Sequence, residues 1–138
     1  MADKKSMRHL EVKRLAMVRA QGGRRFTNML DEMFAMQERF GGRFVDFKNL
    51  TVRQRERWTK EFVVCCMDEL SEVLNWCNWK HWKKKSYPVD EVELKYELVD
   101  LWHFVMSLML VWGMGPEDLF SMYRVKMHEN VNRQKRGY

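Results

Sequence analysis

Residues 90–112 read DEVELKYELVDLWHFVMSLMLVW, and this stretch decides the fold. Asp90 can cap the start of a helix, and Glu93 stands at the reciprocal position of a capping box. After Leu98 the side chains are apolar on nearly every side, which predicts a buried central helix. The Gly-Met-Gly that follows then ends the helix.

A second long helix precedes this one. Thr51 and Gln54 have the spacing of another capping box. Beyond them, one stripe at helical spacing holds Trp58, Phe62, Cys65, Cys66, Glu69, Glu72, Val73 and Trp76. We expect this helix to continue to about Lys85, because Tyr87 precedes a proline and is biased away from helical geometry.

Three shorter helices complete the predicted fold. They are a weakly amphipathic segment at Ser6–Ala20, a helix at Thr27–Arg39 and a last helix that starts at Pro116. No stretch has a convincing strand pattern. The fold class is therefore all-α, a compact bundle of about five helices. A length of 138 residues suits one domain. We expect residues 1–25 to form a basic N-terminal arm or helix, and residues 26–138 to form the single domain.

The net charge and the cysteines indicate which kind of partner and which cellular compartment to expect. The net charge of +6 favours an anionic partner, either nucleic acid or a phosphate ligand, although a solvated basic arm explains much of the excess. The three cysteines include an adjacent pair and show neither a disulfide framework nor zinc spacing, so the cytosol is the expected compartment. The charged first residues do not resemble a signal peptide. The apolar run Leu98–Trp112, which Asp100 and His103 interrupt, is too short to span a membrane.

Two pairs of carboxylates carry the predicted chemistry. Glu69 and Glu72 share one face of the first long helix, and Glu97 and Asp100 repeat the spacing on the next. Such pairs are common on solvated helix faces, but these lie among apolar side chains, where a carboxylate needs a partner. A short connection should make the two helices antiparallel neighbours, so that the four groups converge. Because Mg²⁺ takes oxygen ligands and shares them with phosphates, the pattern predicts a magnesium site.

Three segments resemble a known family. Asp68-Glu-Leu-Ser-Glu-Val73, Glu97-Leu-Val-Asp-Leu-Trp-His-Phe104 and the tail from Lys126 to Tyr138 are similar to motifs of the all-α, dimeric-type dUTPases. Those enzymes belong with the MazG-like nucleotide pyrophosphohydrolases. The chain is similar to their compact, phage-like versions. Gly41 stands where the family often has asparagine, which leaves the identity of the base open.

The resemblance implies roles for particular residues. Magnesium ligands would be Glu69, Glu72, Glu97 and Asp100, and either Glu69 or Glu72 would also orient or deprotonate the attacking water. Gln37 would help to hold the nucleoside, and His103 and Asn130 would lie around the base and sugar. The phosphates and the rest of the substrate would be contacted by Lys126, Arg133 and Tyr138. Either Trp79 or Trp82 would pack against the base. From the residues alone, other roles remain open. The polar residues of the last helix could form a solvated basic face, His103 could be a core histidine, and the tryptophans could belong to the core or to an interface.

The implied activity is magnesium-dependent hydrolysis of dUTP to dUMP and pyrophosphate. Two or three Mg²⁺ ions would take part, with Mn²⁺ as an alternative ion. One alternative is a pyrophosphohydrolase that acts on dCTP, a purine dNTP or a modified dNTP. Another is a helical protein without enzymatic activity that binds nucleic acid or another protein, although the carboxylate pairs would repel a phosphate backbone. The large apolar side chains also predict a homo-oligomer, at least a dimer, with no membrane partner.

Overall fold

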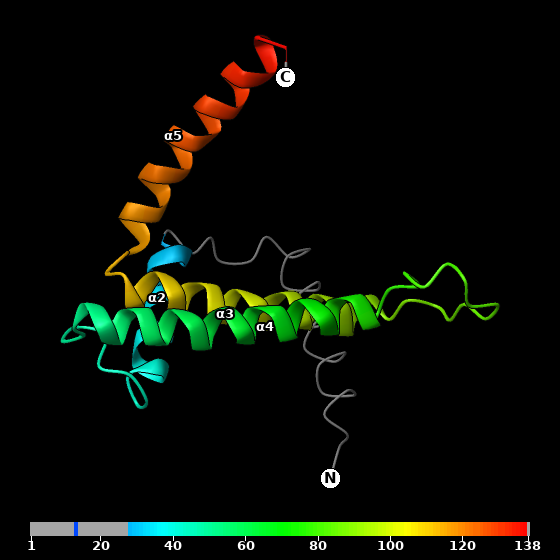
Figure 1. Ribbon diagram of the computed structural model, residues 1–138, viewed down its shortest axis with the longest axis horizontal. Helices are drawn as coiled ribbons and strands as arrows, with labels where there is room; N and C mark the ends of the chain where they lie inside the picture. Colours follow the sequence, from blue (N-terminus) through cyan, green and yellow to red (C-terminus); the bar gives the residue numbers. More distant parts are fainter. Residues whose placement is uncertain (1–12, 14–27, 138) are drawn as a thin grey trace. The chain divides into compact units, whose positions relative to one another are not determined.

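The computed structural model describes Lys13 and residues 28–137, and within them every regular element is a helix (Figure 1). The helices are α2 (Met29–Gly41), α3 (Val52–Asn75), α4 (Glu91–Val111) and α5 (Pro116–Lys135). This confirms the all-α fold class. The predicted helix at residues 6–20 and the basic arm lie outside the described residues, apart from Lys13, which is helical.

The chain forms two compact units. Of the described residues, the first contains Lys13 and residues 60–105, and the second contains residues 28–59 and 106–137. The helices α3 and α4 each run through both units. The prediction that residues 26–138 form a single domain stays a prediction.

The second unit holds the buried apolar core. Its members are Phe34, Val45, Phe47, Met106 and Val111. Arg55 joins the helices around this core, because its Nη1 donates to the main-chain oxygen of Val111 at 2.6 Å. At Gly41 an added Cβ would lie 2.9 Å from the ring of Phe47, closer than side chains normally pack. The glycine at this position is therefore explained by core packing.

The helix α3 begins with the predicted capping box, but it ends earlier than predicted. The Thr51 amide donates to Oε1 of Gln54 at 2.8 Å, and the Gln54 amide donates to Oγ1 of Thr51 at 3.3 Å. The helix ends at Asn75, so the prediction that it continues to Lys85 was wrong. Asn78 explains the early end, because its side-chain amide exchanges two hydrogen bonds with the main chain of Tyr87, at 2.6 and 3.0 Å. These bonds hold the main chain in a closed loop instead of a helix.

The helix α4 begins where the sequence predicts. The amides of Val92 and Glu93 both donate to Oδ1 of Asp90, at 3.2 and 3.3 Å. The prediction that the helix is buried on nearly every side after Leu98 was wrong at Val99, which is 49% exposed, and Leu98 itself is 45% exposed. The burial of α4 is uneven because its last turns belong to the core of the second unit.

The helix α5 is fixed at its first turn. Gly113 adopts a positive φ of 71°, and the Gly115 amide donates to Oδ2 of Asp118 at 2.9 Å. Pro116 then occupies the first turn, as expected. Among the described residues, no single helix is long and apolar enough to cross a membrane. Taken together, α4 and α5 form a bent pair that is long and apolar enough, by length and composition alone.

Candidate metal and nucleotide site

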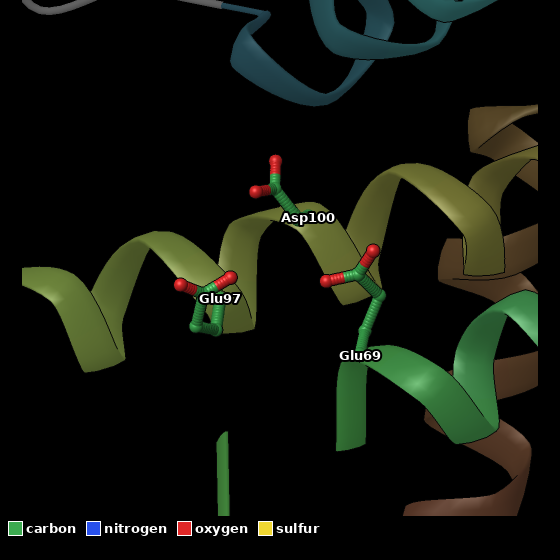
Figure 2. A group of neighbouring side chains, drawn as sticks. All are labelled: Glu69, Glu97 and Asp100. Carbon is green, nitrogen blue, oxygen red and sulfur yellow. The ribbon is translucent and has the colours of Figure 1, made fainter. Parts of the chain in front are cut away.

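The first unit brings three of the predicted carboxylates together. Glu69 on α3 faces Glu97 and Asp100 on α4, as Figure 2 shows. One carboxylate oxygen from each residue lies within 4.8 Å of the others. The spacing of three residues places Glu97 and Asp100 on one side of α4, because side chains three apart along a helix are neighbours. The convergence predicted for these three residues therefore occurs.

Glu97 and Asp100, the two α4 carboxylates of the cluster, each have a partner in the same unit. Glu97 is buried, with 8% of its surface exposed, and it accepts a hydrogen bond from Nε1 of Trp76 at 3.3 Å. Asp100 lies 3.6 Å from Nδ1 of His103, one turn along the helix. The sequence interpretation assigned Trp76 only to the packing stripe and missed its contact with the acidic cluster. The signal was present, since Trp76 follows Glu72 by one helical turn.

The electrostatics of the cluster reflect burial and crowding. Burial, followed by the charges of Glu72, Asp100 and Glu97, raises the pKa of Glu69. The pKa of Glu72 is also raised, first by the charge of Glu97 and then by burial. Glu72 is exposed and lies outside the tight group of three, but its charge acts on the same site. The cluster thus carries mutual repulsion that a bound cation would relieve.

The donor set suits a hard divalent cation. The three converging groups all offer carboxylate oxygens, which Mg²⁺ and Mn²⁺ prefer. Thiolate and imidazole ligands, which would favour zinc, are not part of the described cluster. The residues present therefore fit the predicted class of metal.

A basic aromatic loop follows α3 in the same unit. Trp79 and Trp82 make an edge-to-face contact with ring centroids 5.7 Å apart, and both are exposed. Nζ of Lys80 lies 5.0 Å from the centre of the Trp79 ring. A cavity of about 320 Å³ opens along this loop, and Lys83 and Lys85 contribute to its lining. Exposed rings beside cations could stack on a base and contact phosphates.

Four further predicted substrate residues belong to the second unit: Gln37, Lys126, Asn130 and Arg133. Gln37 is buried, and its Nε2 donates to Oγ of Ser107 at 2.9 Å, so part of its hydrogen-bonding capacity serves the fold. The three polar residues predicted on the last helix, Lys126, Asn130 and Arg133, are exposed on α5. Lys126 forms an ion pair with Glu129, which lowers the pKa of that glutamate. Tyr138 lies outside the described residues.

Comparison with known proteins identifies the family. The profile of a family described as dUTPase matches residues 29–115, which is more than half of the chain and includes all four carboxylates. The chain belongs to the dUTPase family. The match confirms the resemblance to this all-α family, and it ends just before α5.

Several phage proteins are similar to this member of the dUTPase family. A dCTP pyrophosphatase of Enterobacteria phage T4 is 32% identical over 104 residues, covering 59% of this chain and 61% of that protein. A dCTP pyrophosphatase of Enterobacteria phage LZ5 is 39% identical over 71 residues, covering 44% and 41%. A DNA replication protein of phage T4 is 30% identical over 98 residues, covering 54% and 25%. The chain spans about three fifths or less of the length of these relatives, and no solved structure matches it significantly.

Proposed function

We propose that the protein hydrolyses a deoxynucleoside triphosphate to the monophosphate and pyrophosphate. The observation that carries this proposal is the convergence of Glu69, Glu97 and Asp100 within 4.8 Å in a chain of the dUTPase family. These three residues, with Glu72 beside them, would hold Mg²⁺. Bound there, the cation would neutralise phosphate charge and lower the pKa of a water molecule.

The protein side chains would divide the remaining work. Either Glu69 or Glu72 would also orient the attacking water and accept its proton, a role that the resemblance to the dUTPase branch supports. We assign contacts with the sugar or base to His103, whose Nδ1 lies 3.6 Å from Asp100. Trp79 or Trp82 stacks on the base. We assign phosphate contacts to Lys126, Arg133 and Tyr138, and contacts with the nucleoside to Gln37 and Asn130.

We infer that the base is a pyrimidine, with dUTP as the first candidate and dCTP as the second. The His103 position and the residues from Lys126 to Arg133 support dUTP through their resemblance to the dUTPase branch. The phage relatives named dCTP pyrophosphatase support dCTP. A pocket that hydrogen-bonds one base edge rejects the other base strongly, because mismatched polar groups stay unpaired. Values of kcat/KM for dUTP, dCTP, dTTP, dATP and dGTP would decide between the two.

The catalytic proposal is tested by pyrophosphate release with and without Mg²⁺. Glu69→Gln and Glu97→Gln should each abolish turnover and leave the helical circular dichroism unchanged. Glu61→Gln is the matched control, because Glu61 is an exposed carboxylate on the same helix outside the acidic group. Full activity in both variants would contradict the assignment of Glu69 and Glu97 to the metal site. Absence of turnover by the wild-type protein on every dNTP would instead favour the binding alternatives.

We also propose that the protein works as a homo-oligomer, at least a dimer. In the first unit, α3 leaves a row of apolar side chains exposed, and Val63, Met67, Leu70 and Leu74 follow one another at helical spacing. Each is at least 42% exposed, and a continuous apolar strip of this kind usually marks an interface. A monomeric mass in light scattering at micromolar concentration would contradict the proposal.

A further inference from the structure

The loop between α3 and α4 concentrates positive charge. This basic aromatic loop, residues 76–90, follows the end of α3 in the first unit. Between Glu72 and Asp90 the sequence contains no acidic residue. The same stretch contains four lysines: Lys80, Lys83, Lys84 and Lys85. Because no negative charge within the loop offsets them, the lysines favour an anionic partner.

Two tryptophan rings of the loop stand at right angles to each other. Their centroids are 5.7 Å apart, and the angle between their planes is 88°. Trp79 is 46% exposed and Trp82 is 62% exposed. A flat base can lie parallel to only one of two perpendicular rings, so one base cannot stack on both. The pair therefore offers stacking surfaces for two bases, whereas a mononucleotide carries one.

The rings and the cations are held close together along the loop. The side chain of Asn78 exchanges two hydrogen bonds with the main chain of Tyr87, which closes the loop and leaves Tyr87 itself 70% exposed. Nζ of Lys80 lies 5.0 Å from the centre of the Trp79 ring. Proteins that bind single-stranded nucleic acids combine these two features, because rings stack on the bases and cations follow the phosphates.

The loop extends away from the carboxylates that would repel a phosphate backbone. Figure 1 shows it projecting beyond the last turn of α3 and the first turn of α4. Glu69, Glu97 and Asp100 lie on those two helices. A strand bound along the loop therefore does not have to cross the acidic group.

The composition of the loop separates a single strand from two other anionic partners. Residues 75–88 contain no leucine, isoleucine, valine, methionine or phenylalanine, so the loop lacks the aliphatic side chains with which membrane-bound segments enter lipid. In a double helix the bases are already stacked and paired, and a protein must extrude a base to reach its face. Only an unpaired strand uses both the rings and the lysines.

We propose that the basic aromatic loop binds single-stranded nucleic acid. Trp79 and Trp82 stack on two bases of the strand, and the lysines contact its phosphates. The proposed hydrolysis uses one of these rings for the base of its substrate, so a bound strand and the substrate share that ring. The second ring and the run of lysines from Lys83 to Lys85 serve the strand alone.

Fluorescence anisotropy of labelled oligonucleotides tests the proposal. The whole chain is titrated in EDTA, which keeps the metal-dependent hydrolysis out of the measurement. The probes are an oligothymidylate of about 12 nucleotides, an oligouridylate of equal length and a duplex of equal length. We expect a single strand to bind about 10-fold or more tightly than the duplex, because it gains the stacking. Binding of either single strand supports the proposal, and the ratio of the two Kd values shows whether DNA or RNA is preferred.

A tryptophan variant tests the stacking. Trp79→Ala/Trp82→Ala should raise the Kd for the single strand by about 10-fold or more and leave the Kd for the duplex unchanged. Phe40→Ala/Phe44→Ala is the matched control, because these exposed rings also make an edge-to-face contact, with centroids 5.9 Å apart, but acidic residues accompany the basic ones around them. The control should keep the wild-type Kd for every probe.

A lysine variant tests the phosphate contacts. Each phosphate that a cation neutralises contributes about −0.7 to the slope of log Ka against log salt for a single strand. Lys84→Ala/Lys85→Ala should therefore make that slope shallower by about 1.4. Arg53→Ala/Arg57→Ala removes the same charge from exposed positions of α3 and should keep the wild-type slope.

Three results would overturn the proposal. Equal affinity for the single strand and the duplex, or an unchanged Kd in the tryptophan variant, would mean that the rings do not stack on a strand. Displacement of the oligonucleotide by an equal concentration of dTMP would mean that the loop holds one nucleotide only. Binding to phosphatidylserine vesicles that the tryptophan variant loses, without binding of any oligonucleotide, would assign the loop to a membrane surface. The rate of dNTP hydrolysis in Mg²⁺ is measured separately, so failure of the proposed function does not decide this test.

Discussion

Replacing Glu69 with glutamine should have opposite effects on stability with and without Mg²⁺. Glu69 lies within 4.8 Å of two other carboxylates, and two unit charges at that distance repel by about 3 kcal/mol at an effective dielectric constant of about 20. Because Asp100 is 39% exposed, solvent screening reduces the gain from removing the Glu69 charge to about 1 kcal/mol. Without metal, Glu69→Gln should therefore be more stable than the wild-type protein, by about 4 °C in Tm for a chain of this size.

Magnesium should reverse this order. A ligand that binds only the folded state at about one hundred times its Kd stabilises it by about 2.7 kcal/mol. The wild-type protein should gain that stability from Mg²⁺, whereas Glu69→Gln has lost a ligand and should gain little. Hence the variant should melt above the wild-type protein in EDTA and below it in saturating Mg²⁺.

The assay is thermal unfolding followed by circular dichroism, for both proteins in EDTA and across a Mg²⁺ titration. Glu61→Gln is the control, because it removes one negative charge from α3 and should keep the full response to Mg²⁺. The reasoning would be refuted if Glu69→Gln were less stable than the wild-type protein in EDTA and both responded equally to Mg²⁺. That pattern would mean that Glu69 contributes to folding and does not bind the cation.

Two further predictions concern packing and thiol reactivity. Gly41→Asn should lower the free energy of unfolding in urea by about 1–3 kcal/mol, because the new Cβ meets the Phe47 ring at 2.9 Å; an unchanged urea midpoint would contradict this account of the glycine. Burial raises the pKa of Cys65 and Cys66, so their thiolate fractions at pH 8 are small and their alkylation should accelerate as the pH rises towards and beyond 9. The exposed Cys77 should react first with iodoacetamide in peptide mapping by mass spectrometry, and earlier labelling of the half-buried Cys65 and Cys66 would count against that order.

The local features of the fold could be predicted because they depend on residues close in sequence. The caps at Thr51 and Asp90 involve partners within three residues, and both are present in the structure. The end of α3 could not be predicted in the same way. It depends on Asn78 bonding to Tyr87, which requires the main chain to close a loop that no periodicity describes.

The candidate site was predictable in part for the same reason. The spacing of Glu97 and Asp100 places them on one helix face, whatever lies opposite. Which carboxylate of α3 comes nearest is a matter of helix packing, and the structure selects Glu69 for the tight group. The contact between Trp76 and Glu97 also joins two helices, so it appears only when they are paired.

By itself, the sequence determined that the chain is helical, where most of its helices begin, and which side chains share a face, because a helix relates residues three and four apart. The tertiary structure alone decided which of those faces are covered. It buried Gln37 against Ser107 and closed the core over Gly41, and it left Phe120, Tyr123 and Val125 of α5 exposed. Coverage depends on contacts between residues far apart in sequence, and the geometry of those contacts is set only when the helices pack.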